Sequence, residues 1–290
     1  MNTVPRLPVP AGLSEARCRA LLTLLGDPDP AAHAAAVAQL IQHGSGVRDW
    51  LRPHLLSDDP NVRRGAREVF THFGRQTADN RFLAFCLKQG EDLDLEWGAL
   101  LLSHTRYPDA NLEACQALLD DFAATLRQRV VPAQGASAAI ATINQFLFTE
   151  LGFRGNEEDY YHPDNSYLTQ VLDRRVGIPI SLCAVYLSLT RRLQLPVTGV
   201  GLPGHFLCRL QTNTEEVFID CFHGGRLLTK AECCNSLLLN HPDSRDDVLQ
   251  PLTPRRTLLR MCGNLHRIYH HHRDGAEATR LQRYLVALSR

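Results

Sequence analysis

Two residues on consecutive predicted strands, His205 and Asp220, have the chemistry of a proton-transfer pair. The segments "HFLCRL" and "VFIDCF" have strand composition, and the "QTNTEE" between them is turn-forming. A loop over residues 211–214 would place His205 opposite Asp220, and a loop two residues longer would place them on a diagonal. In either register the carboxylate can fix the tautomer of the imidazole and stabilise its charged form. The pair supplies two members of a nucleophile–base–orienter triad, although a single histidine after Pro-Gly is also compatible with a structural role.

A nucleophile for such a triad would stand at a helix N-terminus, where the helix dipole lowers the pKa of a thiol. The pattern predicts a helix over residues 180–193, entered through "VGIP" with Pro179 as the last residue of the entry. Ser181 would point about 100° away from residue 179 around the helix, and Cys183 would lie on nearly the same face but about 6 Å deeper. Ser181 therefore needs a later helix start, and the apolar neighbours of Cys183 favour a core thiol. Both residues remain open as nucleophiles.

The order of these elements resembles that of the transglutaminase-like cysteine hydrolases, in which a helix beginning Gly-x-Cys precedes a strand with His and a strand with Asp. More specifically, "LGFRGNEEDYYHPDNSYL", "VLDRRVGIPISL", "GVGLPGHFL" and "FIDCFHGGRLL" resemble the bacterial SirB-type family, which has a degenerate transglutaminase-like core. The resemblance runs from about Asp92 to Cys233 and puts His205 and Asp220 at two triad positions. The cysteine position falls on Pro179, which has no nucleophile and no N–H. The resemblance therefore implies that the nucleophile has been lost.

What remains of the site could still bind a ligand. Tyr160, Tyr161, Asn165 and Ser166 lie in a polar, turn-rich segment and could line the old substrate groove, with His223 beside a Gly-Gly pair at its floor. Aromatic rings with convergent polar groups are typical of a peptide or small-molecule cleft. The alternative is that Asn165 and Ser166 cap the next helix, and that the Gly-Gly pair is a turn.

Helical segments flank the predicted core. "LGDPDPAAHAAAVAQLIQHG" returns thirty residues later as "LLSDDPNVRRGAREVFTHFG", with Asp-Pro at each start and Gly44 or Gly74 at each end. Asp and Pro suit a helix start and Gly suits a helix end, so the two copies resemble HEAT-type repeats. Two unrelated helices with common caps are the alternative. The last 35 residues predict a helix–turn–helix that resembles a tetratricopeptide-like pair.

The resemblances imply an α+β fold with a transglutaminase-like (papain-like) core and an antiparallel sheet. We expect a flexible leader over residues 1–18, HEAT-like helices over 19–90, the SirB-type transglutaminase-like domain over 91–245 and a C-terminal helical hairpin over 246–290.

The composition argues against nucleic acid and membranes as partners. Thirty-one basic residues balance thirty-one acidic ones, so no overall field attracts nucleic acid or an anionic membrane. The longest apolar run, "ISLCAVYLSL", is far shorter than the ~20 residues of a membrane span, and the N-terminus has no signal-like core. We therefore expect a cytoplasmic protein, with its nine cysteines as reduced thiols.

We expect neither a metal nor a cofactor. The cysteines lack zinc-site spacing. His266 and His270 have the i, i+4 spacing of a metal pair, but no HExxH pattern accompanies them. The run His270 to His272 ends a predicted helix, where cationic rings are favoured without any ligand.

Two classes of function follow. The first is a non-enzymatic regulatory protein whose degenerate cleft holds a peptide or protein partner, with the helical repeats adding surface. The second is an amide-bond hydrolase or acyltransferase in which His205 and Asp220 activate Ser181 or Cys183. A purely structural remnant is a third possibility.

Overall fold

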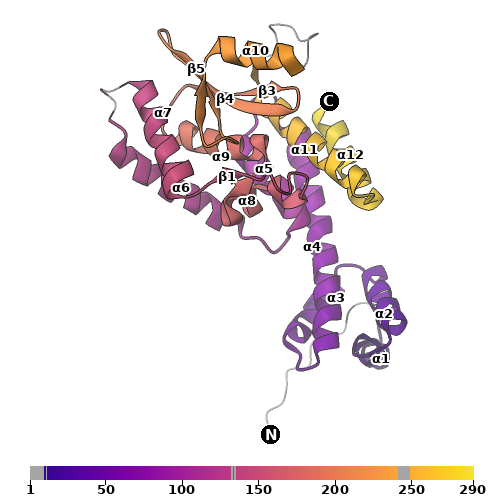
Figure 1. Ribbon diagram of the computed structural model, residues 1–290. Coiled ribbons are helices and arrows are strands. Elements are labelled where there is room, and N and C mark those ends of the chain that lie inside the picture. Colours follow the sequence, from indigo (N-terminus) through magenta and orange to yellow (C-terminus); the bar gives the residue numbers. More distant parts are fainter. Residues whose placement is uncertain (1–9, 11, 132, 134, 241–248) are drawn as a thin grey trace. The chain divides into compact units, whose positions relative to one another are not determined.

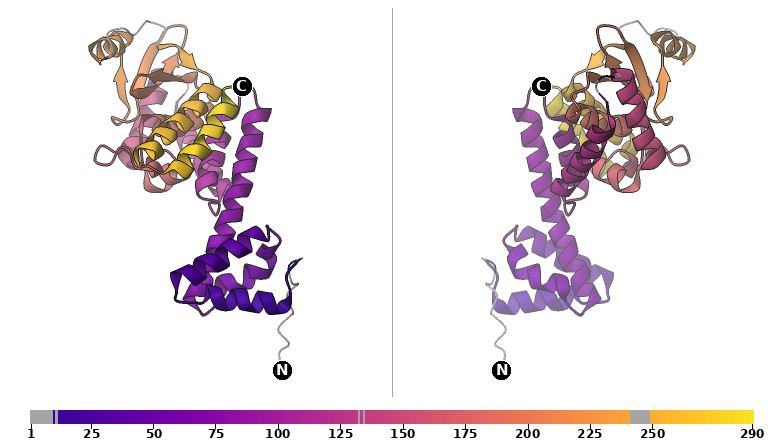
Figure 2. Two further views of the ribbon diagram at one scale, coloured as in Figure 1. Left: turned by 90° about the vertical axis from the view of Figure 1, so that its right-hand side faces the viewer. Right: turned by 90° about the vertical axis from the view of Figure 1, so that its left-hand side faces the viewer.

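The computed structural model describes residues 10, 12–131, 133, 135–240 and 249–290. The protein forms two compact units. The first unit comprises the residues up to Asn80 together with residues 107–109, and the second comprises residues 81–106 and 110–290. Figures 1 and 2 show the elements of each unit, which are described separately below.

The first unit is helical (Figure 1). Its elements are α1 (Glu15–Leu25), α2 (Pro30–Gln42), α3 (Val47–Leu51), a 3-10 turn η1 (Arg52–Leu56) and the first part of α4 (Pro60–Lys88). Their apolar faces share one core, which includes Leu21, Leu25, Leu40, Leu51 and Val69. The predicted helix starts are confirmed: an Asp29 side-chain oxygen accepts from the amide of Ala31 at 3.1 Å, and Asp59 Oδ1 accepts from the amide of Asn61 at 2.8 Å.

One predicted helix end is wrong. Gly44 has φ +83° just after α2, as a helix stop requires. Gly74, however, lies inside α4, which continues to Lys88. A Cβ at Gly74 would lie 2.9 Å from Pro108 Cβ, so this glycine permits a close approach rather than a stop. The HEAT-type interpretation of these helices stays a prediction.

In the second unit, α9 (Pro179–Arg192) lies at the centre (Figure 1). It packs against three helices on one side and the strands β3 and β4 on the other. The three helices are α5 (Leu95–Arg106), α6 (Leu112–Arg129) and α8 (Leu168–Arg174). Between α6 and α8 come α7 (Ala136–Asn144) and a π-helical continuation η3 (Gln145–Glu150). Because α9 is covered on both sides, 11 of its residues are buried, and its position is fixed by packing along its whole length.

The expected antiparallel sheet is present, with strand order β6-β5-β4-β3-β7. The strands are β3 (Val197–Leu202), β4 (His205–Gln211), β5 (Glu216–Asp220), β6 (Arg226–Leu228) and β7 (Pro251–Leu252). A separate parallel pair joins β1 (Arg154–Gly155) to β2 (Val176–Gly177). The pairing of Gln211 with Glu216 gives a β4–β5 loop over residues 212–215. This loop has four residues, like a loop over 211–214, but it begins one residue later. That shift gives the second of the two predicted registers, so His205 and Asp220 lie on a diagonal of one sheet face.

The protein ends in the expected helical hairpin. After α10 (Lys230–Asn240), α11 (Pro254–His271) and α12 (Gly275–Leu288) lie side by side (Figure 2). Arg255 is buried and ties the hairpin down, because its guanidinium donates to the carbonyls of Cys86, Gln89, Ala287 and Leu288, each at 2.9 Å. The face of α11 that meets α5 and α9 is thereby held in place.

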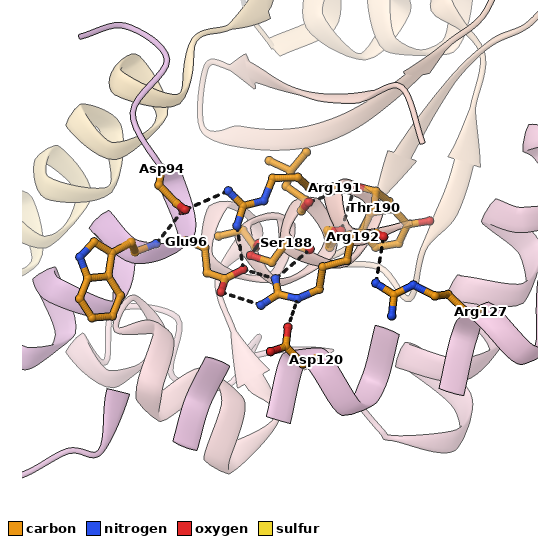
Figure 3. Close-up of polar contacts among 12 residues, drawn as sticks. Asp94, Glu96, Asp120, Arg127, Ser188, Thr190, Arg191 and Arg192 are labelled. Carbon is orange, nitrogen blue, oxygen red and sulfur yellow. Dashed lines mark hydrogen bonds and ion pairs between the residues drawn. The ribbon is translucent and has the colours of Figure 1, made fainter. Parts of the chain in front are cut away.

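The C-terminal end of α9 is anchored by ion pairs (Figure 3). Glu96 at the start of α5 has a side chain only 2% exposed, and its Oε1 accepts from Arg192 Nη2 at 2.9 Å. Arg192 Nε also donates to Asp120 Oδ1 at 2.7 Å, and Arg191 reaches Asp94 at 3.0 Å. The hydrogen bonds to Glu96 raise the pKa of Arg192 above its ordinary value. The last turn of α9 is therefore fixed to α5 and α6, and its first turn lies at the pocket described next.

Within the described residues, no helix combines the length and the apolar character that crossing a membrane requires.

Candidate functional site

His205 and Asp220 meet at the predicted place. His205 Nε2 lies 2.9 Å from Asp220 Oδ2, and His223 Nδ1 lies 2.8 Å from the same oxygen. Asp220 Oδ1 accepts from the amides of Phe222 at 3.1 Å and His223 at 3.3 Å. Burial alone raises the pKa of the Asp220 carboxyl, but the hydrogen bonds and charges of His205 and His223 lower it to about 2. The carboxylate is thus ionised and fully engaged at neutral pH.

The turn after β5 brings His223 to this carboxylate. Gly224 and Gly225 have φ +68° and +76°, and the Gly225 amide donates back to the Asp220 carbonyl at 2.8 Å. A Cβ at Gly225 would lie 2.6 Å from side-chain atoms of Asn144 and Phe148, so the turn also needs the missing side chain for space. The expected Gly-Gly turn is present. That it would fold His223 back onto Asp220 was not predicted.

A pocket of about 660 Å³ opens beside His205. Five of the residues singled out in the sequence line it, namely Tyr160, Tyr161, Pro179, His205 and His223. Tyr160 makes edge contacts with Tyr161 at 5.2 Å and with Phe222 at 5.8 Å between ring centroids, and Tyr161 is 58% exposed at the mouth. These five residues therefore line one pocket, although they come from separate segments of the chain.

Pro179 is the first residue of α9, and it lines the pocket. Proline suits this position, because the first helical N–H has no partner to lose. Among the described residues, the pocket wall includes no serine, threonine or cysteine. At the helix tip that faces His205, the wall thus offers a pyrrolidine ring where a triad would need a nucleophile.

Ser181 has a structural set of contacts. It is fully buried, and its Oγ lies 2.5 Å from the carbonyl of Asn165 and 3.0 Å from that of Ile178. The Ile178 amide donates to the same Oγ at 3.1 Å. The hydroxyl therefore closes the first turn of α9 and ties it to the preceding loop.

Asn165 and Ser166 do not cap α8, so that prediction is wrong. The N-cap of α8 is Tyr167, whose side chain makes no capping hydrogen bond. Asn165 instead donates to the carbonyls of Asp159 at 2.7 Å and Tyr160 at 3.2 Å, and it is fully buried. Ser166 Oγ is buried without a hydrogen-bond partner in the described residues. Neither residue lines the pocket, but Asn165 positions the Tyr160 loop that does.

Cys183 lies in a cluster of three buried thiols. Its Sγ and those of Cys208 and Cys221 lie within 4.8 Å of one another, and all three residues are 0% exposed. Burial and the neighbouring Cys183 raise the pKa of Cys208 and Cys221. Burial also raises the pKa of Cys183, but hydrogen bonds from the other two thiols and the charge of His205 lower it, to about 5. Cys183 itself has no exposed surface.

Two groups of the described residues could hold a metal by proximity alone. They are the three thiols and the set His205, Asp220 and His223, whose ligand atoms also lie within 4.8 Å of one another. Within both sets, hydrogen bonds already join members to one another.

Three basic pocket residues were missed from the sequence. Arg260, Arg267 and His271 line the pocket from α11. The available signal was their spacing of seven and four residues, which puts them on one helix face. His271 belongs to the run His270 to His272. In the sequence, this run is explained by its position at a helix end, so it gives no sign of a ligand site.

A helix tip that faces a His–Asp pair on an antiparallel sheet is the architecture of transglutaminase-like and papain-like hydrolases. The family model described as "Transglutaminase-like superfamily" matches residues 113–263, and the protein belongs to that superfamily.

Relatives come from bacteria and mammals. A UPF0162 protein of Xylella fastidiosa (strain 9a5c) is 38% identical over 186 residues, which is 62% of this chain and 66% of that protein. F-box only protein 21 of Pongo abelii is 31% identical over 232 residues, covering 69% of this chain and 37% of that protein. A UPF0162 protein of Vibrio cholerae serotype O1 is 29% identical over 143 residues, 49% of this chain and 53% of that protein. No solved structure matches the sequence. The SirB-type resemblance stays a prediction.

Proposed function

We propose that the protein holds a peptide or protein partner in the pocket beside His205 and acts as a regulatory binding protein without catalysis. The observation that supports this proposal is that Pro179, the residue on which the resemblance puts the family nucleophile, lines the pocket as the first residue of α9. Because the described residues of the wall include no serine, threonine or cysteine, His205 and Asp220 have none of these usual nucleophiles beside them to activate.

The pocket supports a binding role. A volume of about 660 Å³ lies in the range of peptide and small-molecule sites. Tyr160, Tyr161 and Phe222 offer aromatic surface, and His205 and His223 offer ring nitrogens for hydrogen bonds. Because Asp220 accepts from one nitrogen of each ring, the two imidazoles are held in fixed orientations.

The flanking helices fit the same role. As HEAT-like repeats and a tetratricopeptide-like hairpin, the first unit and α11–α12 would each supply partner surface. All nine cysteines are free thiols, which suits a protein of the SirB type at work in the reducing cytoplasm.

A second candidate is an amide-bond hydrolase or acyltransferase with Cys183 as its nucleophile. The lowered pKa of Cys183 and the nearby charge of His205 favour it. The burial of Cys183 opposes it, because a substrate carbonyl would have to reach a fully enclosed sulfur. Ser181 is weaker still as a nucleophile, since its hydroxyl is committed to the backbone around Ile178.

Labelling with active-site probes separates the two functions. Native protein would be treated with a fluorophosphonate and with iodoacetamide, and residues 181 and 183 would be analysed by peptide mass spectrometry. We expect no stoichiometric label at either position. Stoichiometric labelling of either residue that disappears in His205→Ala would overturn the binding proposal in favour of catalysis.

A peptide selection tests the binding role directly. Random peptides displayed on phage would be selected on the full-length protein and then synthesised. We expect their affinity to fall roughly fivefold or more in Tyr161→Ala, which removes an exposed ring at the pocket mouth. Leu227→Ala is the matched control, because Leu227 is 46% exposed on β6 and does not line the pocket. Failure to select any peptide, or equal losses in both variants, would contradict the proposal.

A further inference from the structure

One wall of the pocket is a cationic helix face. Arg260, Asn264, Arg267 and His271 follow one another on α11 at intervals of four, three and four residues, and all four line the pocket. Such spacing keeps side chains on a single side of a helix. Arg267 and His271 lie beyond residue 263, where the family match ends, so part of this wall comes from outside the matched region.

The rest of the pocket adds no negative charge. It carries His205 and His223, and no Asp or Glu of the described residues lines the pocket. The carboxylate behind these rings, Asp220, is 5% exposed, and its oxygens are taken up by the two imidazoles and two amides. Two arginines and three histidines therefore face a cavity in which no carboxylate of the described residues opposes them.

The two arginines are not neutralised by neighbouring acids. Arg260 Nη2 donates to the carbonyl of His205 at 2.6 Å and to that of Leu202, and Arg267 Nη2 donates to Asn264 Oδ1 at 2.5 Å. No ion pair joins either arginine to a carboxylate of the described residues. Burial and the nearby charge of Arg267 lower the pKa of Arg260. A half-buried cation without a counter-ion is costly, and an anion in the pocket would offset that cost.

We propose that the pocket takes a carboxylate-bearing ligand, in the form of an acidic peptide segment seated between α11 and the imidazoles of His205 and His223. The inference rests on the proposed function and names its ligand class. Arginine recognises a carboxylate through paired N–H donors. Because the protein has no net charge, this preference is local to the pocket. The carboxylate could belong to acidic side chains or to the C-terminus of the peptide, and the two sources are separable.

Isothermal titration calorimetry of the full-length protein at low ionic strength tests the proposal. The probes are hexaglutamate with both ends blocked, hexaglutamine with both ends blocked, and hexaglutamine with a free C-terminal carboxylate. We expect blocked hexaglutamate to bind and blocked hexaglutamine not to bind. Binding of the third probe as well would assign part of the recognition to a peptide terminus.

Matched variants on α11 localise the effect. Arg267→Gln should weaken hexaglutamate binding roughly tenfold, about 1.4 kcal/mol. Arg256→Gln should leave it unchanged, because Arg256 is exposed on the same helix and does not line the pocket. Equal binding of the blocked glutamate and glutamine peptides, no binding of either carboxylate probe, or equal losses in the two variants would overturn the inference. Labelling of Cys183 would instead overturn the proposed function and leave the carboxylate preference intact.

Discussion

His205 Nε2 and Asp220 Oδ2 lie 2.9 Å apart on a diagonal of the β4–β5 pairing. Because Nε2 faces the carboxylate, Nδ1 is the ring nitrogen left for the pocket. That orientation would suit a general base. The same carboxylate also holds His223, which a base–orienter pair does not require. The site thus combines a geometry that fixes an imidazole with Pro179 at the tip of α9.

The Asp220 carboxylate should contribute to stability in a defined pH window. Its pKa is about 2 in the folded protein, against 3.8 for the free group. A depressed pKa stabilises the fold above the unfolded value, and the contribution is lost as pH falls through the folded value. We expect Asp220→Asn to cost about 2 kcal/mol near pH 6, and the difference from wild type to vanish between about pH 4 and pH 2. Urea unfolding at a series of pH values measures both.

Asp121→Asn is the control for this pH series. Asp121 is exposed on α6 and should show little difference from wild type at any pH. A cost of Asp220→Asn that stayed constant down to pH 2 would mean that the two imidazoles do not depress the pKa of this carboxyl.

Pro179→Cys should place a reactive thiol in the pocket. The new sulfur would stand in the first turn of α9, where the helix dipole and the charge of His205 both lower a thiol pKa. We expect iodoacetamide to label residue 179 rapidly near pH 7, and we expect His205→Ala to slow that labelling roughly tenfold. If the thiol at 179 reacted no faster than a free cysteine, His205 and the helix dipole would not be lowering the pKa of a thiol at this position.

The elements with local signals could be predicted from the sequence. The strands of the His205 hairpin are short apolar runs separated by turn residues, and the Asp-Pro pairs mark helix starts. The sequence leaves the β4–β5 register open, because that register depends on hydrogen bonds within the loop itself. The Thr212 amide donates to the Glu215 carbonyl at 2.9 Å, and the Glu215 amide donates to Thr212 Oγ1 at 3.0 Å. Composition alone does not show which four residues close a loop in this way.

Features set by distant contacts could not be predicted. Asn165 is of a residue type that usually bonds locally, which favours a helix cap. In the fold its carbonyl accepts from the Ile178 amide at 3.2 Å, so its role depends on a loop meeting α9. The cationic face of α11 had a visible spacing, but only the packing of α11 against α5 and α9 decides where that face lies.

The three clustered thiols should not react with a maleimide in the native protein. Cys183, Cys208 and Cys221 are 0% exposed, so a bulky maleimide has no path to them without local opening. We expect none of the three to be modified within the time that labels the partly exposed Cys115 and Cys234, and all to be modified in denaturant. Mass spectrometry of the labelled peptides measures this. Native labelling of Cys183 ahead of Cys115 would support the thiol-enzyme alternative.

The buried ion pair at the end of α9 should contribute far more to stability than a surface pair. Glu96→Gln leaves the guanidinium of Arg192, 11% exposed, without its enclosed counter-charge, and only the exposed Asp120 remains beside it. We expect a loss of about 3 kcal/mol in the free energy of unfolding, measured by chemical denaturation. Glu150→Gln, which breaks a pair with Arg129 at 42% and 39% exposure, should cost less than about 1 kcal/mol. Equal costs for the two variants would mean that Glu96 does not anchor α9.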